Sequence, residues 1–120
     1  SLYSVVLPAN ARQKDWQALV GYSARQAYTD PPTVRAVRLH CLFSFTRPAS
    51  HLRSNGEIAK GKPIHATGHK LGDLTKLVRC VEDALTGIVW LDDSQVIEQS
   101  NAKTWGLNPG AMIRVYEVNS

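Results

Sequence analysis

Hydrophobic residues recur with two different periods along this chain. A period of two predicts a half-buried strand over residues 34–45. A short β-branched and aromatic run that stops at Pro8 predicts a strand over residues 2–7, and residues 95–104 and 111–118 are two further strand candidates, of weak and good pattern. A period near 3.6 predicts helices from Asp15 to about Tyr28 and from Asp73 to Leu85. The order strand, helix, strand, loop, helix, strand, strand predicts an α+β fold, a small mixed β-sheet with helices packed on one face.

The second predicted helix has the sharpest division between an apolar and a polar face. Its apolar positions fall in one arc, formed by Leu74, Leu77, Val78, Cys80, Val81, Ala84 and Leu85. Asp73 stands at the border of the arc as a natural N-cap, and Gly87 is a typical helix stop. We therefore expect this helix to pack on the sheet and to turn its polar arc away from the core.

The length of the chain fits one domain. Its 120 residues match the usual size of a single domain, so we expect one over residues 1–120. The last two predicted strands are joined by residues 106–110, which have turn chemistry, and we expect them to pair as an antiparallel hairpin. No apolar run approaches the roughly 20 residues of a membrane helix, so neither a membrane protein nor a signal peptide is expected.

Basic residues gather in the first part of the chain and acidic residues in the last part. Residues 1–72 carry ten Lys or Arg and three Asp or Glu, whereas residues 73–120 carry four and seven. Residues 46–72 lack periodicity and hold five of the basic residues, and a long irregular segment in a compact domain is often functional. This distribution suits a protein that binds a polyanion with one region and concentrates carboxylates in another, as a nuclease does.

Two familiar motifs are incomplete here. Gly56–Lys62 has the glycine and lysine spacing of a phosphate-binding loop, but Pro63 stands where Ser or Thr is needed, so no nucleotide cofactor is expected. Cys41 and Cys80 form neither a disulfide framework nor a Cys-x-x-Cys zinc half-site. We expect both to be small buried side chains in a protein of the reducing cytoplasm.

Three carboxylates stand near the two ends of the second predicted helix. Asp73 begins the helix, and Asp92 and Asp93 follow the turn after it. Hydrolysis of a phosphodiester with magnesium needs two or more carboxylates on one cation, and a helix with a returning segment can bring residues about twenty apart to one point. The residues alone also allow a plainer interpretation, in which Asp73 is only an N-cap and Asp92–Asp93 only a polar turn.

The segment from Asp73 to Val96 resembles the signature of the RusA family of Holliday-junction resolvases, small dimeric endodeoxyribonucleases of phages and prophages. The residues that carry the resemblance are Asp73-Leu74-Thr75-Lys76-Leu77, Arg79, Asp83-Ala84-Leu85-Thr86-Gly87 and Trp90-Leu91-Asp92-Asp93-Ser94-Gln95-Val96. The segment Arg47-Pro48-x-Ser50-His51 is similar to phage members too. The resemblance implies a RusA-like homodimer that resolves four-way DNA junctions by paired nicks, in a bacterial cell or a phage-infected host.

The resemblance implies a role for each matching residue. Asp73 and Asp93 would be catalytic ligands of Mg²⁺, or of Mn²⁺, with Asp92 beside them as a further ligand. Arg79 stands where members carry a catalytic Lys or Arg and would stabilise negative charge on the scissile phosphate; the alternative is an exposed pair with Asp83. The residues expected to bind DNA are six basic ones and a histidine: Arg47, His51, Arg53, Lys60, Lys62, Lys70 and Lys76.

Two positions depart from the family pattern. Thr75 stands in place of the second acidic residue, and Gly72 in place of the proline before the first aspartate. Thr offers a neutral oxygen, so the metal would be held more weakly unless another acidic group, such as Glu98, fills the vacancy. Two alternatives stay open: a junction-binding protein with impaired cleavage, and a basic structural module that binds another protein.

Overall fold

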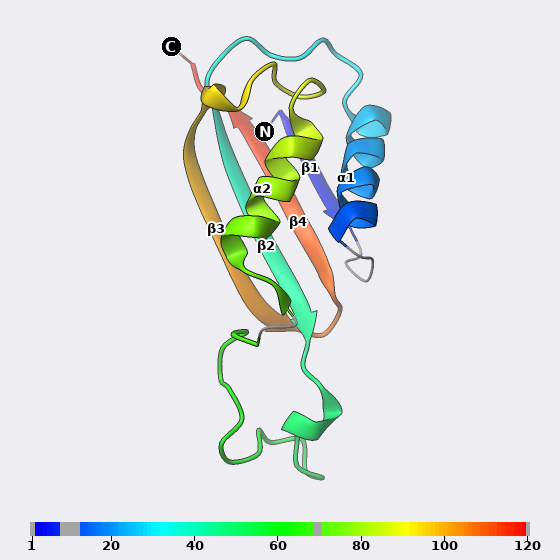
Figure 1. Ribbon diagram of the computed structural model, residues 1–120, viewed down its shortest axis with the longest axis vertical. Helices are drawn as coiled ribbons and strands as arrows, with labels where there is room; N and C mark the ends of the chain where they lie inside the picture. Colours follow the sequence, from blue (N-terminus) through cyan, green and yellow to red (C-terminus); the bar gives the residue numbers. More distant parts are fainter. Residues whose placement is uncertain (1, 8–12, 69–70, 120) are drawn as a thin grey trace.

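The computed structural model describes residues 2–7, 13–68 and 71–119 (Figure 1). The regular elements follow in the order β1 (Tyr3–Leu7), α1 (Gln13–Ala27), β2 (Val37–Thr46), η1 (Ala49–His51), α2 (Leu74–Leu85), η3 (Asp93–Gln95), β3 (Val96–Gly106) and β4 (Gly110–Glu117). The predicted strands and helices are therefore all present, with ends that differ from the expected ones by a few residues. The expected α+β class is confirmed.

The four strands form one mixed sheet in the order β1-β4-β2-β3. β4 is antiparallel to both β1 and β2, whereas β3 is parallel to β2. The predicted hairpin of the last two strands is wrong, because β2 lies between them. Burial explains the order: Ile113 and Val115 of β4 are fully buried and suit an inner strand, whereas residues 97–100 of β3 are exposed and suit an edge.

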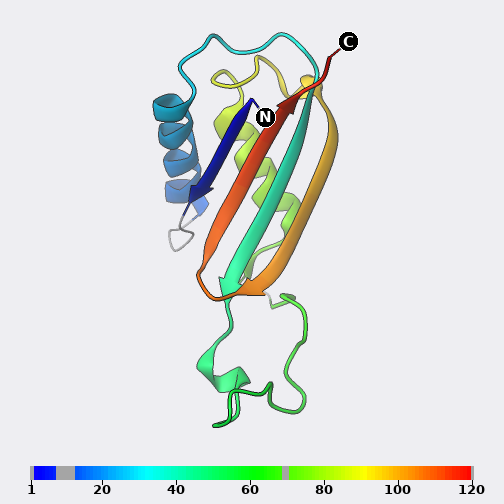
Figure 2. The ribbon, with the colours of Figure 1, turned by 180° about the vertical axis from the view of Figure 1, so that it is seen from behind.

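Both helices pack on the same face of the sheet, as expected, and Figure 2 shows that the described residues place no helix over the other face. The hydrophobic core lies between these two layers. It includes Val20 of α1, Val81 and Leu85 of α2, and Leu39 and Phe43 of β2. Gly87 has a φ of 87° and ends α2 as predicted, since this left-handed conformation favours glycine.

Residues 47–68, which we call the finger, extend beyond the end of the sheet where β2 and β3 finish (Figures 1 and 2). The finger accounts for the elongated shape of the chain, which measures 51 × 26 × 21 Å. The sequence predicts an irregular segment here, and the structure adds that it forms an arm and does not fold back over the sheet. The arm is therefore available to a partner on several sides.

Both cysteines are buried, as expected, and neither forms a disulfide within the part of the chain that the structure describes. Burial, with a smaller contribution from the negative charge of Glu82, raises the pKa of the Cys41 thiol to about 12. Burial and the charge of Asp83 raise the pKa of the Cys80 thiol to about 11. Both thiols are therefore protonated and unreactive in the folded protein at neutral pH.

Among the described residues, no helix combines the length and apolarity that a membrane crossing requires.

Candidate active site

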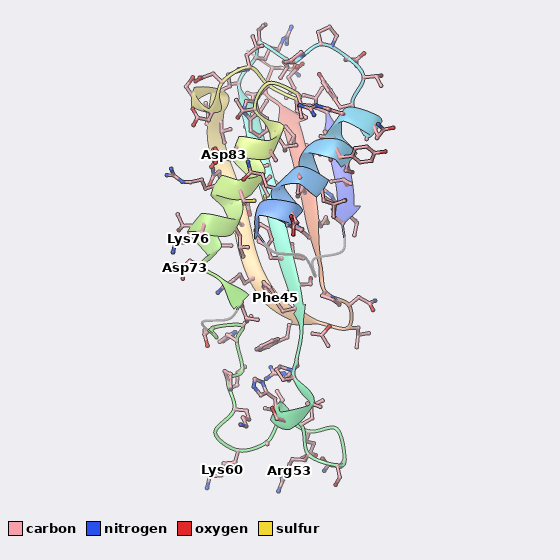
Figure 3. The ribbon with its side chains drawn as sticks, turned by 45° about the vertical axis from the view of Figure 1, so that its right-hand side comes forward. Phe45, Arg53, Lys60, Asp73, Lys76 and Asp83 are labelled. Carbon is pink, nitrogen blue, oxygen red and sulfur yellow. The ribbon has the colours of Figure 1, made fainter. Side chains whose placement is uncertain are left out.

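Asp73 lies at the end of α2 nearer the finger (Figure 3). It occupies the predicted N-cap position, with an extended backbone, but its side chain makes no capping hydrogen bond. The carboxylate instead faces the Lys76 ammonium at 3.7 Å, and both side chains are exposed. The interpretation of Asp73 as only a capping residue therefore lacks the hydrogen bond that capping requires. The carboxylate is exposed beside Lys76 and can also bind a ligand from solvent.

A second cation lies close to this end of the helix. The Lys103 Nζ of β3 donates a hydrogen bond to the Gly72 carbonyl oxygen at 2.9 Å, directly before Asp73. Lys103 was not among the predicted site residues, because the register of β3 against α2 cannot be deduced from the pattern of residues 95–104. This hydrogen bond joins the start of α2 to β3. The position of Asp73 is therefore held both by the helix that it begins and by the sheet.

Arg79 lines a pocket of about 180 Å³ between α2 and β3. The pocket is formed by Leu74, Thr75, Val78, Arg79, Glu82, Gln99 and Asn101. The alternative pairing of Arg79 with Asp83 does not occur, since no ion pair of Arg79 exists within the part of the chain that the structure describes. The guanidinium therefore shares a polar recess with Thr75, nearly two turns of helix after Asp73, where it can meet a phosphate group.

Asp92 and Asp93 lie at the other end of α2, in the short turn η3 that leads into β3. The Asp92 carboxylate accepts a hydrogen bond from the Ser94 amide at 2.9 Å and caps this turn. These hydrogen bonds with Ser94 lower the pKa of Asp92 below its usual range, so the group carries a full negative charge at neutral pH. Asp93 is exposed beside it.

The three aspartates do not converge within one chain. α2 separates Asp73 from Asp92, and its 12 residues span about 18 Å. The expectation that the helix and the returning segment bring these carboxylates to one point is wrong, because the segment after the helix enters β3 at the far end. No group of three or more His, Cys, Asp or Glu side chains among the described residues could hold a metal ion. The residues of a single chain therefore do not fit a carboxylate-bound Mg²⁺.

Glu98 does not fill the vacancy at Thr75 either. Its carboxylate forms an ion pair with the Arg38 guanidinium at 2.5 Å. Glu98 also lies near the start of β3, whereas Lys103, which contacts the Asp73 end of α2, lies near its finish. The end of α2 that carries Asp73 and Thr75 thus has one carboxylate, not two.

Two of the residues predicted to bind DNA have a structural role in the finger. The Arg47 guanidinium donates to the carbonyl oxygens of Pro63 at 2.5 Å and Ile64 at 3.1 Å, and lies 4.7 Å from the centre of the Trp105 ring. The His51 ring meets the same Trp105 edge-on at 5.7 Å. Partial desolvation and the positive charges of Lys62 and Arg47 lower the pKa of His51, so this side chain is neutral at pH 7.

The remaining cations predicted to bind DNA have different surroundings. Arg53, Lys60 and Lys62 are exposed on the finger and form no ion pair within the described ranges. Lys76 is exposed and faces Asp73. Lys70 lies outside the described residues. Three finger cations are therefore open to phosphate groups, whereas Arg47 is engaged by the protein itself.

The comparison with protein families identifies this architecture. The sequence model of the family "Endodeoxyribonuclease RusA" matches residues 4–116, which is nearly the whole chain. The chain belongs to the RusA family. RusA proteins are endodeoxyribonucleases that resolve Holliday junctions, so nuclease activity and binding of branched DNA follow from this membership. No curated protein matches the chain.

The structure explains two residues of the RusA signature that carry no charge. Trp90 is fully buried behind the acidic pair, and its indole Nε1 donates to the Thr86 hydroxyl at 3.1 Å. The Gln95 Oε1 accepts from the Leu91 and Asp92 amides at 2.9 and 2.8 Å. The Gln95 Nε2 donates to the carbonyl oxygens of Thr33 and Arg35, both at 2.8 Å. Gln95 thus joins the turn that carries Asp92 and Asp93 to the segment before β2.

Replacing Gln95 by Ala should loosen this turn without unfolding the domain. Four hydrogen bonds are lost, two of them to exposed amides that water can satisfy, so we expect the free energy of unfolding to fall by about 1–2 kcal/mol. Misplacement of the acidic pair should reduce the nicking rate by about a hundredfold. Faster amide hydrogen exchange at residues 91–95 would accompany the loss. Gln26→Ala, an exposed change on α1, is the matched control, and equal rates for the two variants would contradict the role of Gln95.

Proposed function

We propose that this RusA protein is a metal-dependent, structure-selective endonuclease that acts on four-way DNA junctions as a homodimer. The observation that carries the proposal is the position of its acidic residues. Asp73 and the Asp92–Asp93 pair lie at opposite ends of one helix and both ends are exposed, so each end of α2 holds one part of a catalytic group. A second copy of the chain supplies the missing part.

Two-fold symmetry provides the required arrangement in a simple way. A two-fold axis that passes beside the middle of α2, at a right angle to the helix, makes the helices of the two subunits antiparallel, so the start of one lies beside the finish of the other. Asp73 of one subunit then meets Asp93 of the partner subunit, and the same contact occurs twice. β3 supports this arrangement, because it is an edge strand whose exposed side offers unpaired backbone groups and Ile97 to a second copy. The dimer has two sites, which matches two opposing strands of a junction.

Asp73, with Asp92 and Asp93 of the partner subunit, would hold Mg²⁺, or Mn²⁺, in this composite site. The bound ion would activate a water molecule and neutralise charge on the phosphate. The protein's own contribution is Arg79, which lies one turn of helix after Thr75 and faces the same pocket. Its guanidinium would stabilise the negative charge that develops on the scissile phosphate.

The finger cations would hold the arms of the junction through their phosphates. Arg53, Lys60 and Lys62 are exposed, and a homodimer carries each of them twice. Contacts to phosphates do not recognise the base sequence, so binding would depend on the shape of the DNA. We place this activity in the cytoplasm of a bacterial cell or a phage-infected host, where the thiols of Cys41 and Cys80 stay reduced.

Cleavage of a synthetic four-way junction tests the proposal. With Mg²⁺ or Mn²⁺ we expect paired nicks in opposing strands, and little cleavage of a linear duplex of the same sequence. Affinity for the junction should fall by about a thousandfold between 50 and 200 mM salt, since six exposed finger cations per dimer release bound counterions. Junction binding that is independent of salt, or equal cleavage of linear DNA, would overturn the proposal.

Thr75 favours a second candidate function. It leaves a single carboxylate at its end of α2, so the metal would be held weakly or not at all. In that case the protein binds junctions but does not cut them. The same assay separates the two functions: tight, salt-dependent binding with no nicks under any divalent cation supports the binding protein. Thr75→Asp should then create or strengthen cleavage.

A further inference from the structure

We propose that the tip of the finger inserts a wedge, formed by Leu52 and Ile58, against the unstacked bases at the branch point of a DNA junction. The inference rests on the proposed function and extends it, because it names what the finger contacts on a branched substrate. It is carried by three properties of the finger: a fixed base, a folded tip, and an apolar pair set among cations.

The base of the finger is fixed to the sheet. Arg47 directly follows β2. Its guanidinium joins the first segment of the finger to the returning segment through hydrogen bonds to the carbonyl oxygens of Pro63 and Ile64. The same guanidinium stacks on Trp105 near the end of β3. Ala66, on the returning side, is buried. A force applied at the tip is therefore transmitted to the sheet, as a wedge requires.

The tip of the finger has a defined fold. The Gly56 amide donates to the Arg53 carbonyl oxygen at 2.9 Å and closes a turn, and Gly56 has a φ of 87°, which favours glycine. Leu52 and Ile58 form an antiparallel bridge just behind this turn. Side chains of directly opposed residues lie on the same face of such a pair, so these two form one apolar unit. They are 40% and 44% exposed, although burial in the domain would be favourable for both.

Cations surround this apolar unit. Figure 3 shows Arg53 and Lys60 at the extreme end of the finger, both pointing away from the sheet. Glu57 is the only acidic residue among residues 47–68. Basic side chains beside an exposed apolar pair fit a nucleic acid, whose phosphates meet the cations while apolar side chains contact base faces. The continuous stack of base pairs is interrupted where strands change partners, so unstacking costs less at a branch point than within a continuous duplex, and the wedge fits the branch point better.

The fluorescence of 2-aminopurine placed beside the branch point reports whether bases are unstacked. The measurement uses a four-way junction and a linear duplex, without divalent cations so that no strand is cut. Wild-type protein should raise the fluorescence of the junction severalfold. Leu52→Ser/Ile58→Ser should reduce this rise at least fivefold and lower the preference for junction over duplex about tenfold, while affinity for the duplex stays within twofold. Both changes lie on an exposed tip, and an unchanged melting temperature checks that the fold is intact.

Two comparison variants make the result specific. Val34→Ser removes an apolar side chain that is 78% exposed in the segment between α1 and β2. This variant should raise the fluorescence of the junction as much as wild-type protein does. Arg53→Gln/Lys60→Gln should weaken binding to junction and duplex alike and reduce the slope of log affinity against log salt by about two per subunit. Leu52→Ser/Ile58→Ser behaving like Val34→Ser would overturn the wedge, as would junction binding by wild-type protein without a rise in fluorescence. Wild-type protein with no preference for the junction would instead overturn the proposed function.

Discussion

Mixing the Asp73→Asn and Asp93→Asn variants should restore nicking that each variant alone has lost. In the proposed homodimer each variant alone has two damaged sites, so we expect its nicking rate to fall by at least about a thousandfold. In a heterodimer, the composite arrangement places both substitutions in one site and leaves the other site with Asp73 and Asp93 intact. Random mixing makes about half of the dimers heterodimers, and one site in two is then active, so about a quarter of the wild-type sites return.

The products distinguish this arrangement from one in which each chain builds its own site. A heterodimer with a single active site makes one nick per binding event, so unpaired nicks should replace the paired nicks of the wild type. Subunits must be exchanged by co-expression or by mild denaturation before the assay. A mixture with no more activity than the separate variants would show that the aspartates do not meet across the dimer. Double substitution in one chain, mixed with wild type, is the control for subunit exchange.

The elements of the fold were predictable because burial imposes a period on the sequence. Residues 74–85 show this best: their apolar arc is the face that α2 packs on the sheet. The order of the strands in the sheet could not be predicted, because a period shows which face of a strand is buried and does not show which strand lies beside it. The hairpin prediction relied on the turn at 106–110 and gave too little weight to polarity. Exposed, polar residues at 98–100 are the sign of an edge strand.

The residues of the candidate site remain a prediction from the family signature, and their geometry could not be predicted from the sequence. The signature supplied Asp73, Arg79 and Asp93, yet the predicted helix itself already set its two ends about 18 Å apart. The finger shows a different limit. Charge alone could not separate Arg47 from Arg53, because the difference lies in Trp105 and in two carbonyl groups that are distant in sequence. A cation that follows a strand and precedes an arm is a candidate for holding the arm.

Trp90 connects the stability of the domain with the position of the acidic pair. The side chain is 0% exposed and is the largest in the fully buried part of the core. Its carbonyl oxygen accepts from the Gly87 amide at 2.6 Å, which closes the turn after α2. Backbone bridges to Thr33 and Thr86 fix the residue on both sides. Asp92 follows two residues later, so a shift of Trp90 would also move the carboxylates of Asp92 and Asp93.

Trp90→Ala should therefore reduce the free energy of unfolding by about 3–5 kcal/mol, since truncation of a buried Trp leaves a large cavity. A domain of this size commonly has only about 5–15 kcal/mol in total, so the variant should be partly unfolded at 37 °C. Urea unfolding, followed by circular dichroism at one protein concentration, measures the loss. Trp90→Phe keeps most of the volume, and the Thr86 hydroxyl still donates to the Glu82 carbonyl oxygen, so a loss of about 1–2 kcal/mol and retained nicking are expected. A loss below about 1 kcal/mol for Trp90→Ala would contradict the central place of this side chain in the core, because cavity formation cannot cost so little where neighbours are held by a rigid sheet.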